Sequence, residues 1–424
     1  MRVVHINVTA TLSTGRIAVG ISQALMARGH KALIVFSRGY PPTGVPWIRV
    51  GNRADVLAHA ALARITDRAG FFSRLATRKL VRQLRAYQPD VVHLHNLHGY
   101  YLHLPTLFQY LKEENLPVVW TLHDCWAYTG HCAYYTMAAG EASRRAGRTH
   151  RSATSHGCDR WQSGCGKCSQ TRTYPQSLLL DQSRRNWQEK RALISALADV
   201  TLITPSRWLK NEVQQSFLKK FPVFCIPNGI DLNKFHLCDD LDYLEDVLRK
   251  HHLEDLGERK LLLSVASTWD KRKGLADFVA LSDMLPPEYL IVLVGLSAWQ
   301  RERVPRHIWA IERTENLREL CALYTAADLY ISLSREETMG MTLLEAMACG
   351  TQVLCYRATA LPESVTPAVG AVVPLGNLQA VAAEVERLCA SPKSAADCRA
   401  RAEAYDQNRC FTEYSKLYQA VWDR

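Results

Sequence analysis

The stretch "RVVHINVTATLSTGRIAVGISQALMARGHKALIVFSR" (residues 2–38) indicates the fold class of this chain. Residues 2–8 and 31–38 are short runs rich in apolar side chains, which predict strands, and residues 15–30 between them have helical periodicity. Two strands joined through one helix form a parallel pair, because parallel strands need a crossover connection. The stretch therefore predicts a parallel sheet with helices packed on it.

The same alternation continues along the rest of the chain. Further apolar runs of strand length occur at 90–96, 117–124, 199–206, 259–267, 289–295, 328–334 and 351–357. A Pro-Asn-Gly turn within 221–237 interrupts the series near its middle. Because 424 residues are too many for one ordinary core, the predicted fold is α/β. We expect two doubly wound, Rossmann-like domains that face an interdomain cleft.

Charge and hydropathy narrow the classes of partner. Residues 1–237 hold 31 Lys and Arg against 13 Asp and Glu, a net +18; residues 238–424 hold 21 against 28, a net −7, and the two halves sum to +11. A basic half indicates an anionic partner: nucleic acid, a membrane surface or a phosphorylated substrate. No apolar run reaches the ~18 residues of a spanning helix, and residues 1–10 lack the apolar region of a signal peptide. We expect a cytoplasmic protein.

Three segments that follow predicted strands are candidates for binding an anionic group. "WDKRKG" (269–274) supplies Lys271, Arg272 and Lys273, which either neutralise a diphosphate or form a solvated face. "EETMGMTLLEAMACG" (336–350) combines a glycine at a helix start with two acids. "TLSTGRIA" (11–18) opens a helix at Gly15, which is either a turn residue or a ligand contact. It matches neither the dinucleotide fingerprint nor the P-loop.

In the second segment the identities of the residues are informative as well as their spacing. The E-x7-E arrangement of Glu337 and Glu345 with an internal glycine resembles the donor-site pattern of retaining GT-B glycosyltransferases of the family 4 type. The resemblance covers most of the chain and runs in register through "TLHDCWAYTGHC" (121–132), "IPNGID" (226–231), "SVASTWDKRKGL" (264–275), "IVLVGLS" (291–297), "LYTAADLYISLSREET" (323–338) and "TALPE" (359–363).

The resemblance implies a GT-B architecture and a division of the chain. Residues 1–237 would form the acceptor-side domain, with a cysteine-rich insertion at about 130–170. Residues 238–405 would form the donor domain, and a C-terminal helix at 406–424 would pack back on the N-terminal domain. The implied activity is transfer of a sugar from a nucleotide-diphosphate sugar to an acceptor, with retention at the anomeric carbon. No cofactor is required for such a transfer.

The resemblance also implies roles for single residues of the second half. By position, Glu345 holds the ribose of the nucleotide, and Glu337 lies near the transferred sugar as a catalytic-site acid. The sugar or phosphate is contacted, chiefly through backbone N–H groups, by Thr338, Met339, Gly340 and Met341.

Other positions implied by the resemblance would contact the diphosphate or the donor sugar. Lys273 neutralises the diphosphate, where charge develops in the transition state. His123 would reach the donor sugar from the N-terminal domain as the second catalytic-site residue, although a histidine in a turn, taken alone, is more often structural. Gly15 lies beneath the phosphates. One departure is Ala266-Ser267 where many members carry Gly-Arg, so Arg272 or Lys271 is an alternative cation.

Four of the thirteen cysteines are clustered in sequence. Cys132, Cys158, Cys165 and Cys168 provide a C-x2-C pair and two further thiols, which suit a tetrahedral zinc ion. The surrounding segment has little periodicity, so a structural metal would compensate for the lack of a core. Free thiols are the alternative, since a cytosolic chain keeps cysteines reduced.

The basic first half suggests a membrane partner. Residues 63–87 carry Arg and Lys among apolar residues, with Phe71 and Phe72 adjacent. They predict either an amphipathic helix on an anionic membrane or a helix with a solvated basic face. Residues 144–151 add four more cations. The family context favours a glycan or polyprenyl-diphosphate-linked acceptor at the inner face of the plasma membrane, in synthesis of a surface polysaccharide such as O-antigen or exopolysaccharide. Nucleic acid is not expected, because no binding module is recognised.

Two other functions fit the same motifs. A nucleotide-sugar epimerase or hydrolase of GT-B architecture would act without a glycan acceptor. A non-catalytic subunit that binds nucleotide sugar would show binding without turnover.

Overall fold

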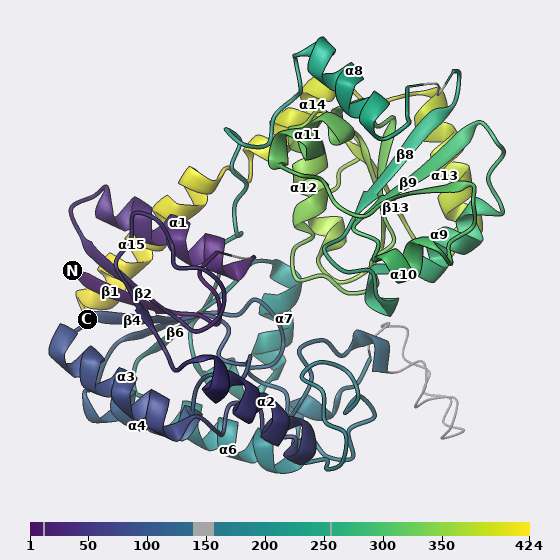
Figure 1. The fold of residues 1–424 in the computed structure, drawn as a ribbon. Coiled ribbons are helices and arrows are strands. Elements are labelled where there is room, and N and C mark those ends of the chain that lie inside the picture. The colour runs from purple at the N-terminus through teal and green to yellow at the C-terminus, as the bar shows by residue number, and fades with distance from the viewer. Residues whose placement is uncertain (12, 139–156, 255–256) are drawn as a thin grey trace. The chain divides into compact units, whose positions relative to one another are not determined.

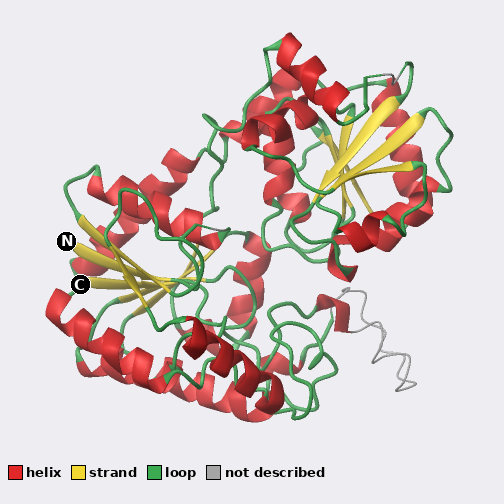
Figure 2. Ribbon diagram, in the orientation of Figure 1, coloured by secondary structure: helices red, strands yellow, loops and turns green. Residues whose placement is uncertain are grey.

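The computed structural model describes residues 1–11, 13–138, 157–254 and 257–424 (Figure 1). These residues form two compact units: an N-terminal unit of 1–227 with 410–424, and a C-terminal unit of 228–409. Each unit is an α/β domain around one sheet (Figure 2). The expected fold class of two doubly wound α/β domains is confirmed. Residues 228–237, which the sequence placed with the first domain, cluster with the second.

The N-terminal sheet has seven strands in the order β3-β2-β1-β4-β5-β6-β7. The strands are β1 (Arg2–Ile6), β2 (Lys31–Phe36), β3 (Trp47–Arg49), β4 (Val91–Leu94), β5 (Val118–Thr121), β6 (Val200–Thr204) and β7 (Val223–Cys225). Every neighbouring pair is parallel. The helices are α1 (Thr14–Met26), α2 (Arg53–Thr66), α3 (Arg74–Tyr87), α4 (Leu104–Glu113), α6 (Ser183–Ser195), α7 (Arg207–Gln215) and α15 (Gln407–Trp422).

Alternation along the strands gives this sheet two apolar faces. Val3, Val91, Val119 and Ile203 lie on one face and pack against α1 and the part of α15 from residue 410 onward. Their chain neighbours, such as Val4 and Val92, lie on the other face with residues of α3 and α4. The close approach of α1 and α15 requires Gly20, because a Cβ there would lie 2.7 Å from the ring of Phe411.

The C-terminal sheet has six parallel strands in the order β10-β9-β8-β11-β12-β13. The strands are β8 (Lys260–Val265), β9 (Tyr289–Val294), β10 (Ile308–Ile311), β11 (Leu329–Ser332), β12 (Val353–Tyr356) and β13 (Gly370–Val373). The helices are α8 (Leu241–Lys250), α9 (Leu275–Ser282), α10 (Ala298–Arg301), α11 (Leu317–Ala326), α12 (Met341–Ala348), α13 (Leu378–Ala390) and α14 (Ala395–Glu403). Contacts link α8, α11, α12 and α14 into one layer, and α9 and α13 into another.

Each sheet reverses its strand order at one point. The reversal lies between β1 and β4 in the N-terminal unit and between β8 and β11 in the C-terminal unit. In doubly wound sheets the chain leaves such a pair in opposite directions, which opens a crevice beyond the carboxyl ends of the two strands. The loops that follow β8 and β11 are therefore where a ligand of the C-terminal unit is expected.

The basic segment 63–87 is not one helix, and this prediction was wrong. Helix α2 ends at Thr66 and α3 begins at Arg74. Phe71, between them, is buried, and the guanidinium of Arg68 lies 3.7 Å from its ring centroid. Residues 144–151 lie outside the described residues. Among the helices that the structure describes, none is long and apolar enough to span a membrane.

Candidate functional site

The loop after β8 forms a tight, cation-bearing turn. Residues Lys271–Lys273 make one 3₁₀ turn, and Asp270 caps it by accepting the backbone N–H of Lys273 at 2.9 Å. Gly274 follows with φ +79°, and a Cβ there would lie 2.3 Å from the carbonyl oxygen of Leu333. Only glycine permits this backbone and this approach. The turn is thereby held against the end of β11, on the other side of the switch point.

Two of its three cations meet Glu337. Lys273 Nζ lies 2.5 Å and Arg272 Nη1 3.2 Å from Glu337 Oε1. All three side chains are largely enclosed, at 16%, 19% and 14% exposed respectively. Arg272 also donates to the carbonyl oxygen of Glu336 at 2.9 Å. Lys271 is exposed to solvent. The structure thus brings Arg272 and Lys273 to the predicted acid and leaves Lys271 at the surface.

Glu337 is held ionised by this pairing. Burial opposes the charged form, but the charges of Lys273 and Arg272 and hydrogen bonds from Lys273 and Ser334 outweigh it, so the pKa of Glu337 is lowered. Its backbone is fixed as well: its N–H donates to Thr359 Oγ1 at 2.8 Å, and that hydroxyl donates to its carbonyl oxygen at 2.7 Å. The sequence reading missed Thr359, although it stands first in the quoted "TALPE" motif.

Gly340 starts helix α12 directly after this acid. Its φ of +77° and ψ of +55° are left-handed, and a Cβ there would lie 2.6 Å from Leu361 Cδ2. Met339 is buried, while Thr338 and Met341 are half-buried. The first N–H groups of a helix have no acceptor within the helix and, with the helix dipole, attract anions. The segment 338–341 can therefore present backbone N–H groups to a phosphate or a sugar hydroxyl.

Glu345 lies farther along α12. Tyr324 of α11 donates its hydroxyl to Glu345 Oε2 at 2.9 Å, and the glutamate side chain is half-buried. The buried Tyr330 of β11 interacts electrostatically with both Glu345 and Glu337. Tyr330 is thus a shared neighbour of the two acids. Tyr324, which orients Glu345, was not identified from the sequence.

His123 belongs to a buried row of histidines in the N-terminal unit. The histidine row consists of His5, His93, His95 and His123, none more than 6% exposed. His5 Nδ1 lies 3.1 Å from His95 Nε2, and His95 Nδ1 lies 3.0 Å from His123 Nε2. Each such contact holds one shared proton, so the tautomers of these three rings are linked. His95 therefore contributes to orienting His123.

Burial keeps the histidine row uncharged near neutral pH. It lowers the pKa of His5 to about 3 and, with a partly opposing effect of Asp124, that of His123 to about 4. The pKa values of His93 and His95 are also lowered well below 6.5, first by burial and then by their histidine neighbours. His123 is therefore a neutral hydrogen-bonding group rather than a cation for phosphate.

Three donor atoms of the histidine row lie within 4.8 Å of one another, the one such group among the described His, Cys, Asp and Glu residues. Both ring nitrogens of His93 already have partners, Tyr418 at 2.5 Å and Thr121 at 2.8 Å. Both nitrogens of His95 contact the other histidines of the row. Hydrogen bonding, rather than a metal ion, accounts for this cluster.

Close packing of the backbone requires glycine at position 15. It lies in the first turn of α1, and a Cβ there would come within 2.5 Å of the carbonyl oxygen of Thr9. The residues around it are tied together by Asn7, which donates to Thr9 O at 2.9 Å and to Thr14 Oγ1 at 3.0 Å. The glycine thus lets α1 begin close to the carboxyl end of β1, at the switch point of its sheet.

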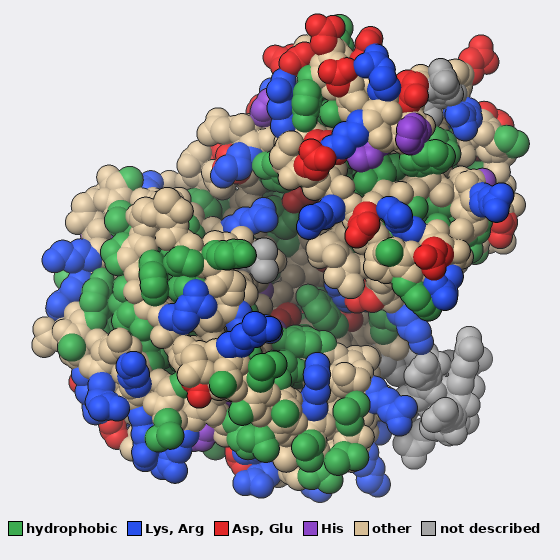
Figure 3. Space-filling view, viewed as in Figure 1, with side chains coloured by type: hydrophobic (Ala, Val, Ile, Leu, Met, Phe, Trp, Pro, Cys, Tyr) green, Lys and Arg blue, Asp and Glu red, His purple; other side chains and the backbone are tan. Residues whose placement is uncertain are grey.

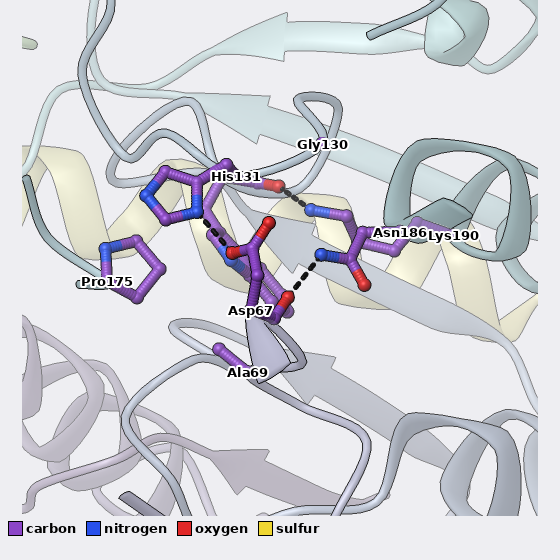
Figure 4. A pocket seen from close by; sticks show the side chains of 8 residues that line it. Asp67, Ala69, Gly130, His131, Pro175, Asn186 and Lys190 are labelled. Atoms are coloured by element: carbon purple, nitrogen blue, oxygen red, sulfur yellow. Dashed lines mark hydrogen bonds and ion pairs between the residues drawn. The ribbon is translucent and has the colours of Figure 1, made fainter. Parts of the chain in front are cut away.

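A pocket of the N-terminal unit lies beside the segment that carries the cysteines (Figure 4). Asp67 lies between His131, whose Nδ1 contacts its carboxylate, and Asn186, which donates to its carbonyl oxygen at 2.5 Å. Lys190 donates to the carbonyl oxygen of Trp126 at 2.5 Å, and burial lowers the pKa of Lys190 to about 7. The polar groups of this pocket bind one another and hold α6 against the loop after β5.

Comparisons with known proteins identify the family of this chain. Residues 14–234, more than half of the chain, match the family model described as Glycosyltransferase Family 4, and residues 249–405 match that described as Glycosyl transferases group 1. WcaC of Escherichia coli K12, named as a colanic acid biosynthesis glycosyl transferase, is 23% identical over 434 residues, covering 95% of this chain and 95% of its own.

Solved structures share the fold over the whole chain. Sucrose-phosphate synthase from Thermosynechococcus elongatus superposes with a TM-score of 0.67 at 16% identity, covering 100% of this chain and 99% of its own. HepE of Anabaena, in complex with UDP and glucose, superposes with a TM-score of 0.64 at 15% identity, covering 99% of this chain and 100% of its own. At such identities the likeness establishes the fold.

Proposed function

Because the chain belongs to glycosyltransferase family 4, we propose that it transfers a sugar from a nucleotide-diphosphate sugar to a glycan acceptor with retention at the anomeric carbon. The observation that supports this most directly is the Arg272–Lys273 pair beside Glu337 and the glycine-started helix α12. HepE, which shares the fold, binds UDP and glucose. UDP-sugars are therefore the first donors to test.

Each residue of the site would have its own role in binding the donor and in the transfer. Lys273 and Arg272 neutralise the diphosphate, which gains negative charge as it leaves the sugar. Backbone N–H groups of 339–341 bind sugar or phosphate oxygens, and Glu345, oriented by Tyr324, accepts hydrogen bonds from the ribose. Neutral His123 hydrogen-bonds the donor sugar. The departing phosphate takes the acceptor proton on the same face of the sugar, so the transfer requires no metal ion.

The test combines donor binding with product analysis. A thermal-shift panel of UDP-, GDP- and ADP-sugars should show stabilisation by one nucleotide class, about 3–4 kcal/mol at a few hundred times Kd. With that donor and a glycan acceptor, proton NMR of the new linkage should show the anomeric configuration of the donor. An inverted product would refute retention, and failure of every nucleotide sugar to bind would refute the proposal as a whole.

The same experiment separates the alternatives. Release of free sugar or of an epimer in the absence of acceptor would indicate a hydrolase or epimerase. Binding without any turnover would indicate a regulatory subunit. The similarity over 95% of both chains to WcaC, named for colanic acid biosynthesis, favours a surface polysaccharide as the product.

An exposed apolar surface on α2 supports a lipid-linked acceptor at an anionic membrane. The α2 patch consists of Leu57, Leu62 and Ile65 of the helix and Leu178, Leu179 and Leu180 of a later loop, all between 44% and 74% exposed. The loop is fixed along the helix end, since Leu178 N–H donates to Arg64 O at 2.6 Å. Figure 3 shows hydrophobic side chains gathered over α2 with Lys and Arg around them. This combination suits a membrane interface.

We expect the double substitution Leu178→Ser and Leu179→Ser to weaken binding to vesicles of phosphatidylglycerol and phosphatidylcholine at least tenfold. Each leucine inserted into lipid contributes about 1.5–3 kcal/mol. Co-sedimentation with such vesicles measures the effect. Leu241→Ser, which alters an exposed leucine of the C-terminal unit, is the matched control and should bind like the parent chain. Equal binding by the double variant would exclude the α2 patch as the membrane contact.

A further inference from the structure

The segment between β5 and α6 spans residues 122–182, of which the structure describes 122–138 and 157–182. The described part holds two short 3₁₀ turns, Thr136–Ala138 and Arg160–Gln162, and no strand. Because the described part gains little stability from backbone pairing, other interactions have to fix it.

Four cysteines of this segment are gathered in one region. Cys132 is buried, and Cys158, Cys165 and Cys168 are half-buried against the same apolar core. Cys132 Sγ and Cys168 Sγ lie 3.8 Å apart. This equals the sulfur–sulfur edge of ~3.8 Å in a tetrahedral site with Zn–S bonds of about 2.3 Å. Cys132 also interacts electrostatically with the thiols of Cys158 and Cys165.

Backbone N–H groups are directed at three of the four sulfurs. Gly130 N–H donates to Cys165 Sγ at 3.1 Å. The backbone of Arg160 hydrogen-bonds Cys158, and that of Gln170 hydrogen-bonds Cys168, each two residues beyond its cysteine. Donors aimed at sulfur orient it as a metal ligand.

A buried lysine stands beside the cluster. Lys190 of α6 is 1% exposed, and its amino group interacts with Cys165 and Cys132 as well as with Asp67 and Asp124. Four thiolates around one Zn²⁺ leave a net charge of −2, and a buried charge of that sign needs a nearby positive group. Lys190 supplies one, while Trp126 holds it in place through its carbonyl oxygen.

We propose that Cys132, Cys158, Cys165 and Cys168 bind one structural zinc ion that fixes the loop after β5. Binding Zn²⁺ releases the thiol protons to solvent and forms four Zn–S bonds. No third described donor atom lies within 4.8 Å of both Cys132 Sγ and Cys168 Sγ. Closing the tetrahedron therefore moves the sulfurs of Cys158 and Cys165 toward that pair. Gly164 and Gly166, at φ +148° and +155°, flank Cys165 and give its backbone room to adjust.

The site is structural because four protein ligands leave no position for water or substrate. It is independent of the proposed sugar transfer, which uses no metal. Its role is to hold the segment that begins with His123 and Asp124. Asp124 accepts the N–H of Trp126 at 2.9 Å and pairs with His98 at 2.6 Å. Loss of zinc should therefore disturb the surroundings of His123 through its backbone.

The first measurement is the metal content of the full chain purified under reducing conditions. We expect about one zinc per chain, released in full when a mercurial reagent titrates the thiols, as for a tetrathiolate site. Replacement by Co²⁺ should give the charge-transfer and d–d bands of tetrahedral sulfur ligation. A folded chain that carries no zinc, or a Cys132–Cys168 disulfide in its place, would overturn the proposal.

Variants then assign the ligands. Cys165→Ser and Cys168→Ser should each lower bound zinc at least tenfold, whereas Cys225→Ser, a half-buried thiol of β7 outside the cluster, should keep it. If the ligand variants do not fold, chelation of the parent chain decides. Removing zinc should then raise hydrogen exchange in 122–138 and 157–182 but not in 228–409. Unchanged exchange in the loop after zinc removal would equally contradict the proposal.

Discussion

Lowering the pH from 7 to 5.5 is expected to unfold the N-terminal unit while the C-terminal unit stays folded. Five buried histidines have lowered pKa values, namely His5, His59, His93, His95 and His123. In the folded chain burial lowers the pKa of His5 and His59 to about 3 and that of His123 to about 4, and it lowers those of His93 and His95 well below 6.5. In the unfolded chain all five bind protons below about 6.5. Stability is therefore lost as the pH falls below the unfolded-state value.

The expected loss is large. Each neutral buried histidine costs about 1.4 kcal/mol per pH unit below 6.5, so five cost roughly 7 kcal/mol over one unit. His131, whose pKa is raised because Asp67 outweighs burial, opposes part of this loss. The remainder is comparable with the 5–15 kcal/mol that typically stabilises a domain. The C-terminal unit has no buried histidine among its described residues, so it should be much less sensitive.

Hydrogen exchange resolved by peptide and corrected for the intrinsic rate measures the two units separately, which a single melting curve cannot do. His5→Gln should reduce the pH slope of the N-terminal unit by about 1.4 kcal/mol per pH unit, because one titrating group is removed. His307→Gln, at an exposed histidine, should leave the slope unchanged. Equal acid sensitivity of both units would refute the assignment to the five buried histidines.

The strands that were predicted from the sequence and the strands that were missed occupy different positions within the sheets. The nine predicted runs all became central strands, buried on both faces, where a continuous apolar run is required. The four missed strands, β3, β7, β10 and β13, are the edges of the two sheets. Each pairs with a neighbour on one side only, so it does not need the continuous apolar run that marks a central strand.

The candidate site was predictable where its residues lie close in sequence. Glycine turns and cations after a strand specify positions such as Gly274 and Lys273, because the backbone itself requires them. Partners that arrive from distant elements leave no local pattern. Thr359 reaches Glu337, Tyr324 reaches Glu345 and His95 reaches His123 only once the sheets have formed.

The membrane prediction shows the same limit. The two adjacent aromatic residues of the predicted membrane helix, Phe71 and Phe72, stand among basic residues, but tertiary packing buries Phe71 and half-buries Phe72. The exposed apolar surface comes instead from α2 and from Leu178–Leu180, which are far apart in the chain. Hydropathy along one segment does not reveal a surface that two segments build together.

Replacing Lys273 by alanine is expected to lower kcat/KM for the donor that stabilises the chain by about 10²–10³. A positioned charge that meets developing negative charge in an enclosed site contributes about 3–4 kcal/mol to the transition state. Lys273 is 16% exposed and already held at 2.5 Å from Glu337, so its position is fixed before the diphosphate arrives. Most of the loss should appear in kcat, because the charge on the leaving group grows during the reaction.

Lys271→Ala is the matched control, since it removes the same charge from the same turn but at an exposed position. It should change kcat/KM by less than about threefold, as expected for a screened surface charge. The loss of kcat/KM in Arg272→Ala should be closer to that in Lys273→Ala, because Arg272 also contacts Glu337, at 3.2 Å. Equal losses for Lys271 and Lys273 would mean that net charge alone matters, and no loss at Lys273 would place the diphosphate elsewhere. Unchanged melting temperatures in all three variants would confirm that the comparison reports on catalysis rather than folding.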